Sequence, residues 1–214
     1  MAKHTFKQST ATGDTRILAR SAMGYDWNYL ADAETFLFGS TDETAFRMQN
    51  MTAGTGITTG LGTIYKANVA VAGDVITTTI LLDLTGLSSN TALDIIGVNA
   101  AANCHLGQIT AALNGTIFAG QMTCLEVPTT GDPDIDVYSS TVATGTEDVI
   151  ITHADLATEA ALLVAAGDWT LAQTKAFSAY PAADTYLYIV NGGGTTDGVY
   201  DAGIFKIELY GYPA

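Results

Sequence analysis

The fold is decided by one stretch, residues 97–138, which reads GVNAAANCHLGQITAALNGTIFAGQMTCLEVPTTGDPDIDVY. Within it, Asn114-Gly115 lies between two apolar, β-rich runs. This dipeptide is the strongest short-range signal for a β-hairpin, because both residues tolerate positive φ. The run from Thr116 to Val127 is apolar on both faces, which predicts a central strand. The stretch therefore predicts a β-rich protein with a hairpin at its centre.

The predicted hairpin has a register that can be stated in advance. If it is centred on Asn114, the numbers of paired residues sum to 228, and Cys104 lies opposite Cys124. A two-residue Asn-Gly turn would shift this pairing by one residue. Opposed cysteines can meet disulfide geometry, but in a protein made in the cytoplasm we expect two buried, reduced thiols as neighbours on one sheet face. His105 points to the other face of the strand, so no metal site is predicted there.

Period-two alternation and turn residues predict the other strands. Residues 75–84 alternate clearly, with Ile76, Thr78 and Ile80 on one face and Thr77 and Thr79 on the other. Further strands are expected at Thr63–Val71, Val75–Leu84, Leu93–Val98, Val149–Thr152, Trp169–Ser178, Thr185–Val190 and Gly203–Tyr210. Turns at Gly73-Asp74 and at Asn191-Gly192-Gly193-Gly194 predict two more hairpins.

One helix is predicted, over Ala154–Ala166. Leu156, Ala160 and Leu163 fall on one stripe at helical spacing, and Gly167 is a suitable C-terminal stop. The fold class is therefore all-β: a single antiparallel β-sandwich or jelly-roll-like domain with one short helix and an extended N-terminal arm. The expected organisation is an arm with an aromatic segment at residues 1–50 and a β-sandwich domain at residues 51–214.

Composition limits the partners of the chain. Charged residues make up only 14% of 214 residues, so either a large β core or burial in an assembly must replace the usual charged surface. The net charge of −14 argues against nucleic acid and anionic membranes as partners. No run of about eighteen apolar residues and no signal peptide is found, so we expect a protein without a transmembrane helix that is made in a cytoplasm.

Two groups of residues are candidates for a metal site or an active site. Asp132, Asp134 and Asp136 resemble the first half of a calcium loop, but Val137 and Ala143 replace its required Gly and Glu. The spacing therefore predicts a strand with its polar face in water and no metal. The three histidines, His4, His105 and His153, lie in no catalytic motif. We expect no enzymatic activity, no catalytic residue and no cofactor.

The N-terminal segment holds the candidate partner-contacting residues. Lys3, Lys7, Arg16 and Arg20 make residues 1 to about 20 the one basic part of an acidic chain, and Tyr25, Trp27 and Tyr29 follow with large rings. The basic arm is either a frayed terminus or a segment that orders on a neighbouring subunit. The aromatic residues either pack under the sandwich or face a partner. The interface interpretation makes these seven residues its contacts.

A resemblance suggests where such contacts are made. The segments GTGITTGLGTIYKANV, DVITTTILLDLTGL, NCHLGQIT, NGTIFAGQMTCLEVPTTGDPDID and KIELYG, spread over roughly Gly54 to Gly211, resemble a family of virion proteins from marine tailed bacteriophages. The resemblance implies a structural protein of the virion, assembled in the host bacterial cytoplasm, and it carries over no catalytic residue.

Within this family resemblance we expect a capsid decoration, or cement, protein that contacts the major capsid protein and copies of itself. A homotrimer is expected from the abundance of threefold positions on icosahedral shells. A tail or neck component is the alternative. A lectin-like carbohydrate-binding module is a further alternative, since Trp27, Trp169 and the aspartate cluster are residue types that bind sugars.

Overall fold

The structure is a computed structural model that describes residues 7–11, 14–20, 26–30, 35–39, 46–156, 158–193 and 198–213, and as far as residue 48 it gives the backbone path. The chain forms a ten-stranded antiparallel sheet, a four-stranded sheet and a two-stranded sheet. The helices among these residues are short: α1 (Thr55–Thr58), α2 (Ala111–Asn114) and the 3-10 helix η1 (Ala154–Leu156). The all-β fold class is confirmed.

The ten-stranded sheet has the order β1-β2-β3-β4-β5-β6-β7-β16-β10-β13. Its strands are β1 (Lys7–Ala11), β2 (Asp14–Arg20), β3 (Asp26–Leu30), β4 (Thr35–Gly39), β5 (Phe46–Gln49), β6 (Tyr65–Ala72), β7 (Val75–Asp83), β16 (Ala202–Tyr212), β10 (Thr116–Thr129) and β13 (Thr174–Ala176). The four-stranded sheet consists of β12 (Ala160–Leu163), β11 (Ile135–Ser140), β14 (Thr185–Asn191) and β9 (Gly107–Ile109). The two-stranded sheet pairs β15 (Gly198–Val199) with β8 (Ser88–Ser89).

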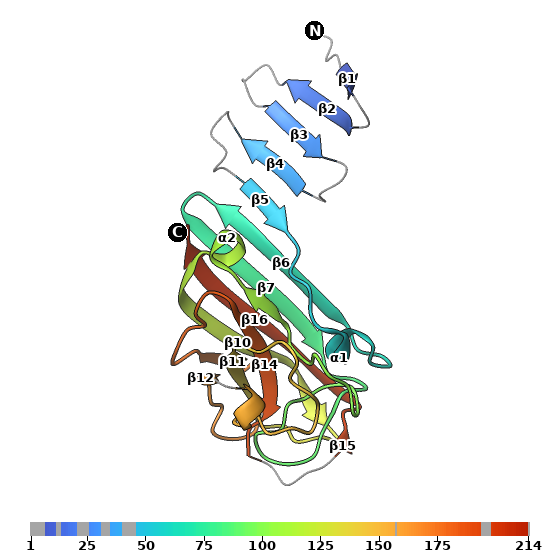
Figure 1. The fold of residues 1–214 in the computed structure, drawn as a ribbon, viewed down its shortest axis with the longest axis vertical. Coiled ribbons are helices and arrows are strands. Elements are labelled where there is room, and N and C mark those ends of the chain that lie inside the picture. The colour runs from blue at the N-terminus through green and yellow to red at the C-terminus, as the bar shows by residue number, and fades with distance from the viewer. Residues whose placement is uncertain are drawn as a thin grey trace.

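A sandwich forms where the four-stranded sheet lies against the β7-β16-β10 part of the large sheet (Figure 1). Residues of both sheets belong to one buried cluster, including Ile80, Ile207 and Met122 from the large sheet and Val137 and Leu187 from the small one. Burial of this apolar surface is the main favourable contribution to folding.

The hairpin predicted from Gly73-Asp74 is confirmed. β6 and β7 pair from Tyr65↔Leu82 to Ala72↔Val75, and Gly73 takes a φ of +60° in the turn. The predicted alternation along β7 is confirmed as well, with Ile76, Thr78, Ile80 and Leu82 buried and the residues between them partly exposed.

The central hairpin prediction is wrong. Asn114-Gly115 does not join two paired strands, because β9 belongs to the four-stranded sheet and β10 to the ten-stranded sheet. Thr110 instead caps the single-turn helix α2, its Oγ1 accepting from the Leu113 amide at 3.1 Å. The buried Asn114 side chain donates to Thr78 Oγ1 at 2.8 Å. A capping threonine three residues before Leu113 was the local signal for this corner.

The predicted C-terminal hairpin is also wrong. β14 pairs with β11 and β9, whereas β16 pairs with β7 and β10, so the two strands lie in different sheets. The predicted strand Leu93–Val98 is reduced to isolated bridges, Asp94↔Ile150 and Ile95↔Val190. Turn residues mark where a strand ends, but not which strand it pairs with.

The predicted helix Ala154–Ala166 is wrong beyond its first turn. Thr158 and Ala166 have φ values of +68° and +57°, which no α-helix contains. Between them β12 pairs with β11, as in Val137↔Leu163. An isolated helix of this length is marginal in water, so pairing with a neighbouring strand overrides its periodicity.

The first five strands extend the large sheet beyond the sandwich. Among the described residues they pair in chain order, each with its immediate neighbours, and β5 joins them to β6 (Figure 1). We call β1–β5 the N-terminal ribbon. The expected arm is therefore built from extended strands that continue a sheet.

The register of β7 can be tested by paired substitutions. Ile80→Ala removes a fully buried side chain and should lower the free energy of unfolding by about 2–5 kcal/mol. Thr79→Ala, on the partly exposed face, should change it by no more than about 1 kcal/mol. Urea unfolding of both variants measures the difference, and equal losses would contradict this register.

Candidate functional site

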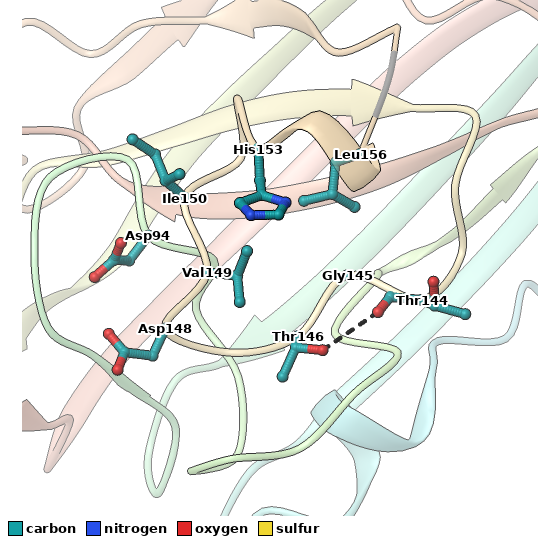
Figure 2. Close-up of a pocket in the computed structure, with 9 residues that line it drawn as sticks. All are labelled: Asp94, Thr144, Gly145, Thr146, Asp148, Val149, Ile150, His153 and Leu156. Carbon is teal, nitrogen blue, oxygen red and sulfur yellow. Dashed lines mark hydrogen bonds between the residues drawn. The ribbon is translucent and has the colours of Figure 1, made fainter.

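A depression of about 530 Å³ lies at the surface of the described part of the chain (Figure 2). It lies beside η1, over the loops that connect the strands of the four-stranded sheet. Its lining is mostly polar at one side and apolar beneath His153, and consists of Asp94, Thr144, Gly145, Thr146, Asp148, Val149, Ile150, His153 and Leu156.

Two carboxylates lie close together on one side of this depression (Figure 2). Asp94 is buried, and its Oδ2 accepts from the backbone amide of Thr91 at 2.5 Å and from the Thr91 hydroxyl at 2.9 Å. Asp148 is exposed and has a φ of +64°. His153 adds an imidazole across Val149. Asp148 provides exposed acceptors that suit contact with a polar or cationic group of a partner, whereas the buried Asp94 is engaged by Thr91.

The wall behind the depression is fixed by Glu147. This buried carboxylate accepts from Ser88 Oγ at 2.7 Å and from the Ala100 amide at 2.8 Å. It therefore joins its own loop to β8 and to the loop that contains Ala100, which are both far from Glu147 in sequence. Sequence reasoning did not single it out, because a glutamate in a Gly/Thr-rich loop is ordinarily solvated.

The aspartate cluster does not face water, so the predicted polar strand face is wrong. Asp132 and Asp136 are 4% and 1% exposed, and β11 is buried along most of its length. Each carboxylate accepts from a backbone amide: Asp132 from Asp134 at 2.9 Å, Asp134 from Gly167 at 3.0 Å and Asp136 from Ala165 at 2.6 Å. The cluster holds the segment after β12 against β11.

A lysine completes this attachment. Lys175 Nζ donates to the carbonyls of Ala165 and Gly167, at 2.7 and 3.2 Å, and lies 4.6 Å from the centre of the Trp169 ring. Trp169 is 1% exposed, and its Nε1 donates to the Ile135 carbonyl at 2.9 Å. The aspartates accept hydrogen bonds from the amides of the segment 165–167, and the lysine donates to its carbonyls. These contacts of the aspartates and Lys175 give the cluster a structural role: they fix the segment after β12 in place.

Burial shifts the acidity of this cluster. It raises the pKa of Asp136 to about 6, against the opposing hydrogen bond from Ala165. It also raises the pKa of Asp134, whose Oδ1 is buried with no hydrogen-bond partner among the described residues. Loss of hydration therefore outweighs the hydrogen bond and the nearby positive charge of Lys175.

The two cysteines are not paired across a hairpin, so the predicted neighbouring positions are wrong. Cys104 precedes β9 and its amide donates to Gly145, whereas Cys124 lies on β10 opposite Phe205. Both are free thiols and fully buried. Burial raises the pKa of Cys104 to about 12 and also raises that of Cys124. Within the described ranges, no three Cys, His, Asp or Glu residues are grouped as ligands for a metal ion.

The sequence-predicted interface residues all precede the sandwich. Lys3 and Tyr25 lie outside the described residues. Lys7 is in β1, Arg16 and Arg20 are in β2, and Trp27 and Tyr29 are in β3. The structure brings these five into one antiparallel ribbon at one end of the large sheet (Figure 1).

Comparisons with protein-family models, with curated proteins and with solved structures found no match. In the part of the chain that the structure describes, no helix has the length and apolar character needed to span a membrane.

The aspartate cluster should make stability depend on pH. The pKa of Asp136 is about 6 in the folded chain and about 4 in an unfolded one, so the folded state binds this proton more tightly. Its contribution is favourable below pH 4 and is lost as pH rises through 6. Asp136→Asn should flatten this dependence and raise stability at pH 7.5 by roughly 1–3 kcal/mol.

Asp74→Asn provides the matched control for Asp136→Asn, because it removes a carboxylate from an exposed turn. Urea unfolding at intervals from pH 4 to 7.5 measures both variants. An Asp136→Asn profile parallel to that of the original chain would contradict the assignment.

The burial of both thiols predicts their reactivity. In the folded chain neither Cys104 nor Cys124 should react with a maleimide within minutes, because the reactive thiolate is rare and shielded. In denaturant, intact mass should show two additions. Rapid labelling of the folded chain, or no labelling after unfolding, would contradict this result.

Proposed function

We propose that this chain is a structural protein of a tailed-phage virion that acts through protein–protein contacts. In this proposal it is a decoration protein of the capsid shell, with the major capsid protein and copies of itself as partners. The observation that supports it best is the N-terminal ribbon, which extends the large sheet beyond the sandwich (Figure 1). Strands without a second layer have little independent stability in water, so contacts with another subunit would stabilise them.

The distribution of charge also supports attachment through the N-terminal segment. The basic excess is confined to the first twenty residues, which carry Lys3, Lys7, Arg16 and Arg20 against Asp14, whereas 16 of the 22 acidic residues follow residue 50. The acidic body repels nucleic acid and anionic membranes, so the proposal includes neither as a partner. The basic positions of the ribbon would approach an acidic protein surface instead.

The same observations support a tail or neck position, which is the second candidate. They give less support to a lectin-like module. Trp169 and Asp136 are each only 1% exposed and are occupied by hydrogen bonds to the backbone, so neither is placed to contact a sugar.

Deletion of residues 1–45 tests the proposal. The truncated chain keeps β5 as an edge for β6 and should retain the circular dichroism spectrum and cooperative unfolding of the sandwich. It should fail to bind capsids assembled without this chain, whereas the full chain should bind them and appear on every capsomer by electron cryomicroscopy. Density confined to the tail would favour the second candidate, and equal binding by the truncated chain would contradict the role of the ribbon.

A further inference from the structure

The backbone register separates two kinds of residue onto the two faces of the N-terminal ribbon. Positions directly opposite each other in an antiparallel pair share a face, as do alternate positions along a strand. Trp27 is opposite Phe38 and Ala19, and Tyr29 is opposite Phe36 and Ile17. The uncharged face defined in this way consists of Gln8, Thr10, Thr15, Ile17, Ala19, Trp27, Tyr29, Phe36 and Phe38.

Every charged residue of β1–β5 has a position on the other face. Arg20 is opposite Asp26, and Arg47 is opposite Leu37, which is itself opposite Asn28. The charged positions of this second face are Lys7, Asp14, Arg16, Arg20, Asp26 and Arg47. Charged and uncharged positions are thus fully separated over five strands. This pattern is typical of a sheet with one solvent-exposed face and one covered face.

The uncharged face lies on the opposite side of the sheet from the sandwich core. Arg47 pairs with Val71, and Val71 pairs with the buried Ile76, so the charged face continues into the core side. The uncharged face continues through Met48, Ala70 and Thr77 into the outer side.

That outer side is mostly polar over the middle of the sandwich, although the exposed Phe118 and Tyr212 stack at its end with ring centres 6.1 Å apart. Lys206 forms a 3.0 Å ion pair with Glu208, and Gln121 donates to Glu208 at 2.8 Å. The apolar side of the sheet therefore changes between the sandwich and the ribbon. The four-stranded sheet packs against the core side, so it cannot cover the aromatic positions.

We infer that the uncharged face of the ribbon is the surface by which two copies of this chain pack face to face about a twofold axis. A face without charges can lie on its own copy without like-charge repulsion, which a twofold interface requires because each patch meets itself. The charged face, with four basic and two acidic positions, has a net positive charge that opposes contact with its own copy. This inference rests on the proposed function in that both use the ribbon for contact between subunits.

The size of the face sets the area available to a pair. Four strands about 4.8 Å apart and about five residues long make a patch of roughly 19 by 17 Å, a plane area of roughly 320 Å². Two packed sheets lie about 10 Å apart, and a contact of this size is small beside the standard of about 800 Å² per partner.

Substitution of one cross-strand aromatic pair tests the inference on the full chain. Light scattering after size exclusion should give twice the 22.3 kDa of one chain. Trp27→Thr with Phe38→Thr keeps β-forming residues, and should raise the dissociation constant of the pair at least about tenfold. Leu18→Thr with Leu37→Thr, on the charged face of the same ribbon, should leave it unchanged.

Cross-linking keeps the test independent of any loss of folding. A bismaleimide that spans about 10 Å should join copies of the Tyr29→Cys variant and not of the Asn28→Cys variant, because the two positions lie on opposite faces. The reverse result would overturn the inference in favour of the charged face.

The mass of the unmodified chain separates the remaining outcomes. A monomer at about 100 µM, or a trimer, would overturn the twofold pairing. A monomer that still coats capsids would make the capsid protein the occupant of this face. A dimer that never binds capsids would support the pairing and count against the proposed function.

Discussion

The structure depends on the burial of alternate residues along β16. This strand lies between β7 and β10 and pairs with both over most of its length. Phe205, Ile207 and Leu209 are each at most 1% exposed, and they pack towards the four-stranded sheet, where Phe205 meets Trp169 at a ring distance of 5.4 Å. A one-residue slip of β16 would turn these three side chains outwards, so the core fixes the register of the central strands.

The features that could be predicted from sequence are those that depend on residues close together in the chain. The alternation of β7 and the Gly73 turn are local, and both are confirmed. The hairpin prediction at Asn114-Gly115 fails because the Asn114 side chain donates a hydrogen bond to Thr78. Thr78 lies in another strand, so the local sequence pattern cannot reveal this contact. The predicted helix fails for the same reason, since β12 gains a partner only when β11 is already in place.

The candidate sites show the same limit. Alternating aspartates are ordinarily solvated, and their burial here depends on amides of the segment around Ala165, which lies about thirty residues further along the chain. The aromatic and basic residues of the first fifty are partner contacts by prediction from the sequence. It could not assign them to faces, because two-sidedness appears only once the register links β2, β3 and β4. The strand pairing, rather than the composition, turns a cluster of large residues into a surface.

The position of β16 has a consequence for biosynthesis. Of the described strands it is the last to leave the ribosome, yet it occupies the middle of the large sheet, between strands made long before it. Until its arrival, the edges of β7 and β10 that pair with it have no permanent partner, while the ribbon strands are already free to pair. A nascent chain therefore presents the ribbon before its own core can close. In a polysome that makes many copies side by side, premature association is a hazard that only rapid completion or chaperone protection of the chain can limit.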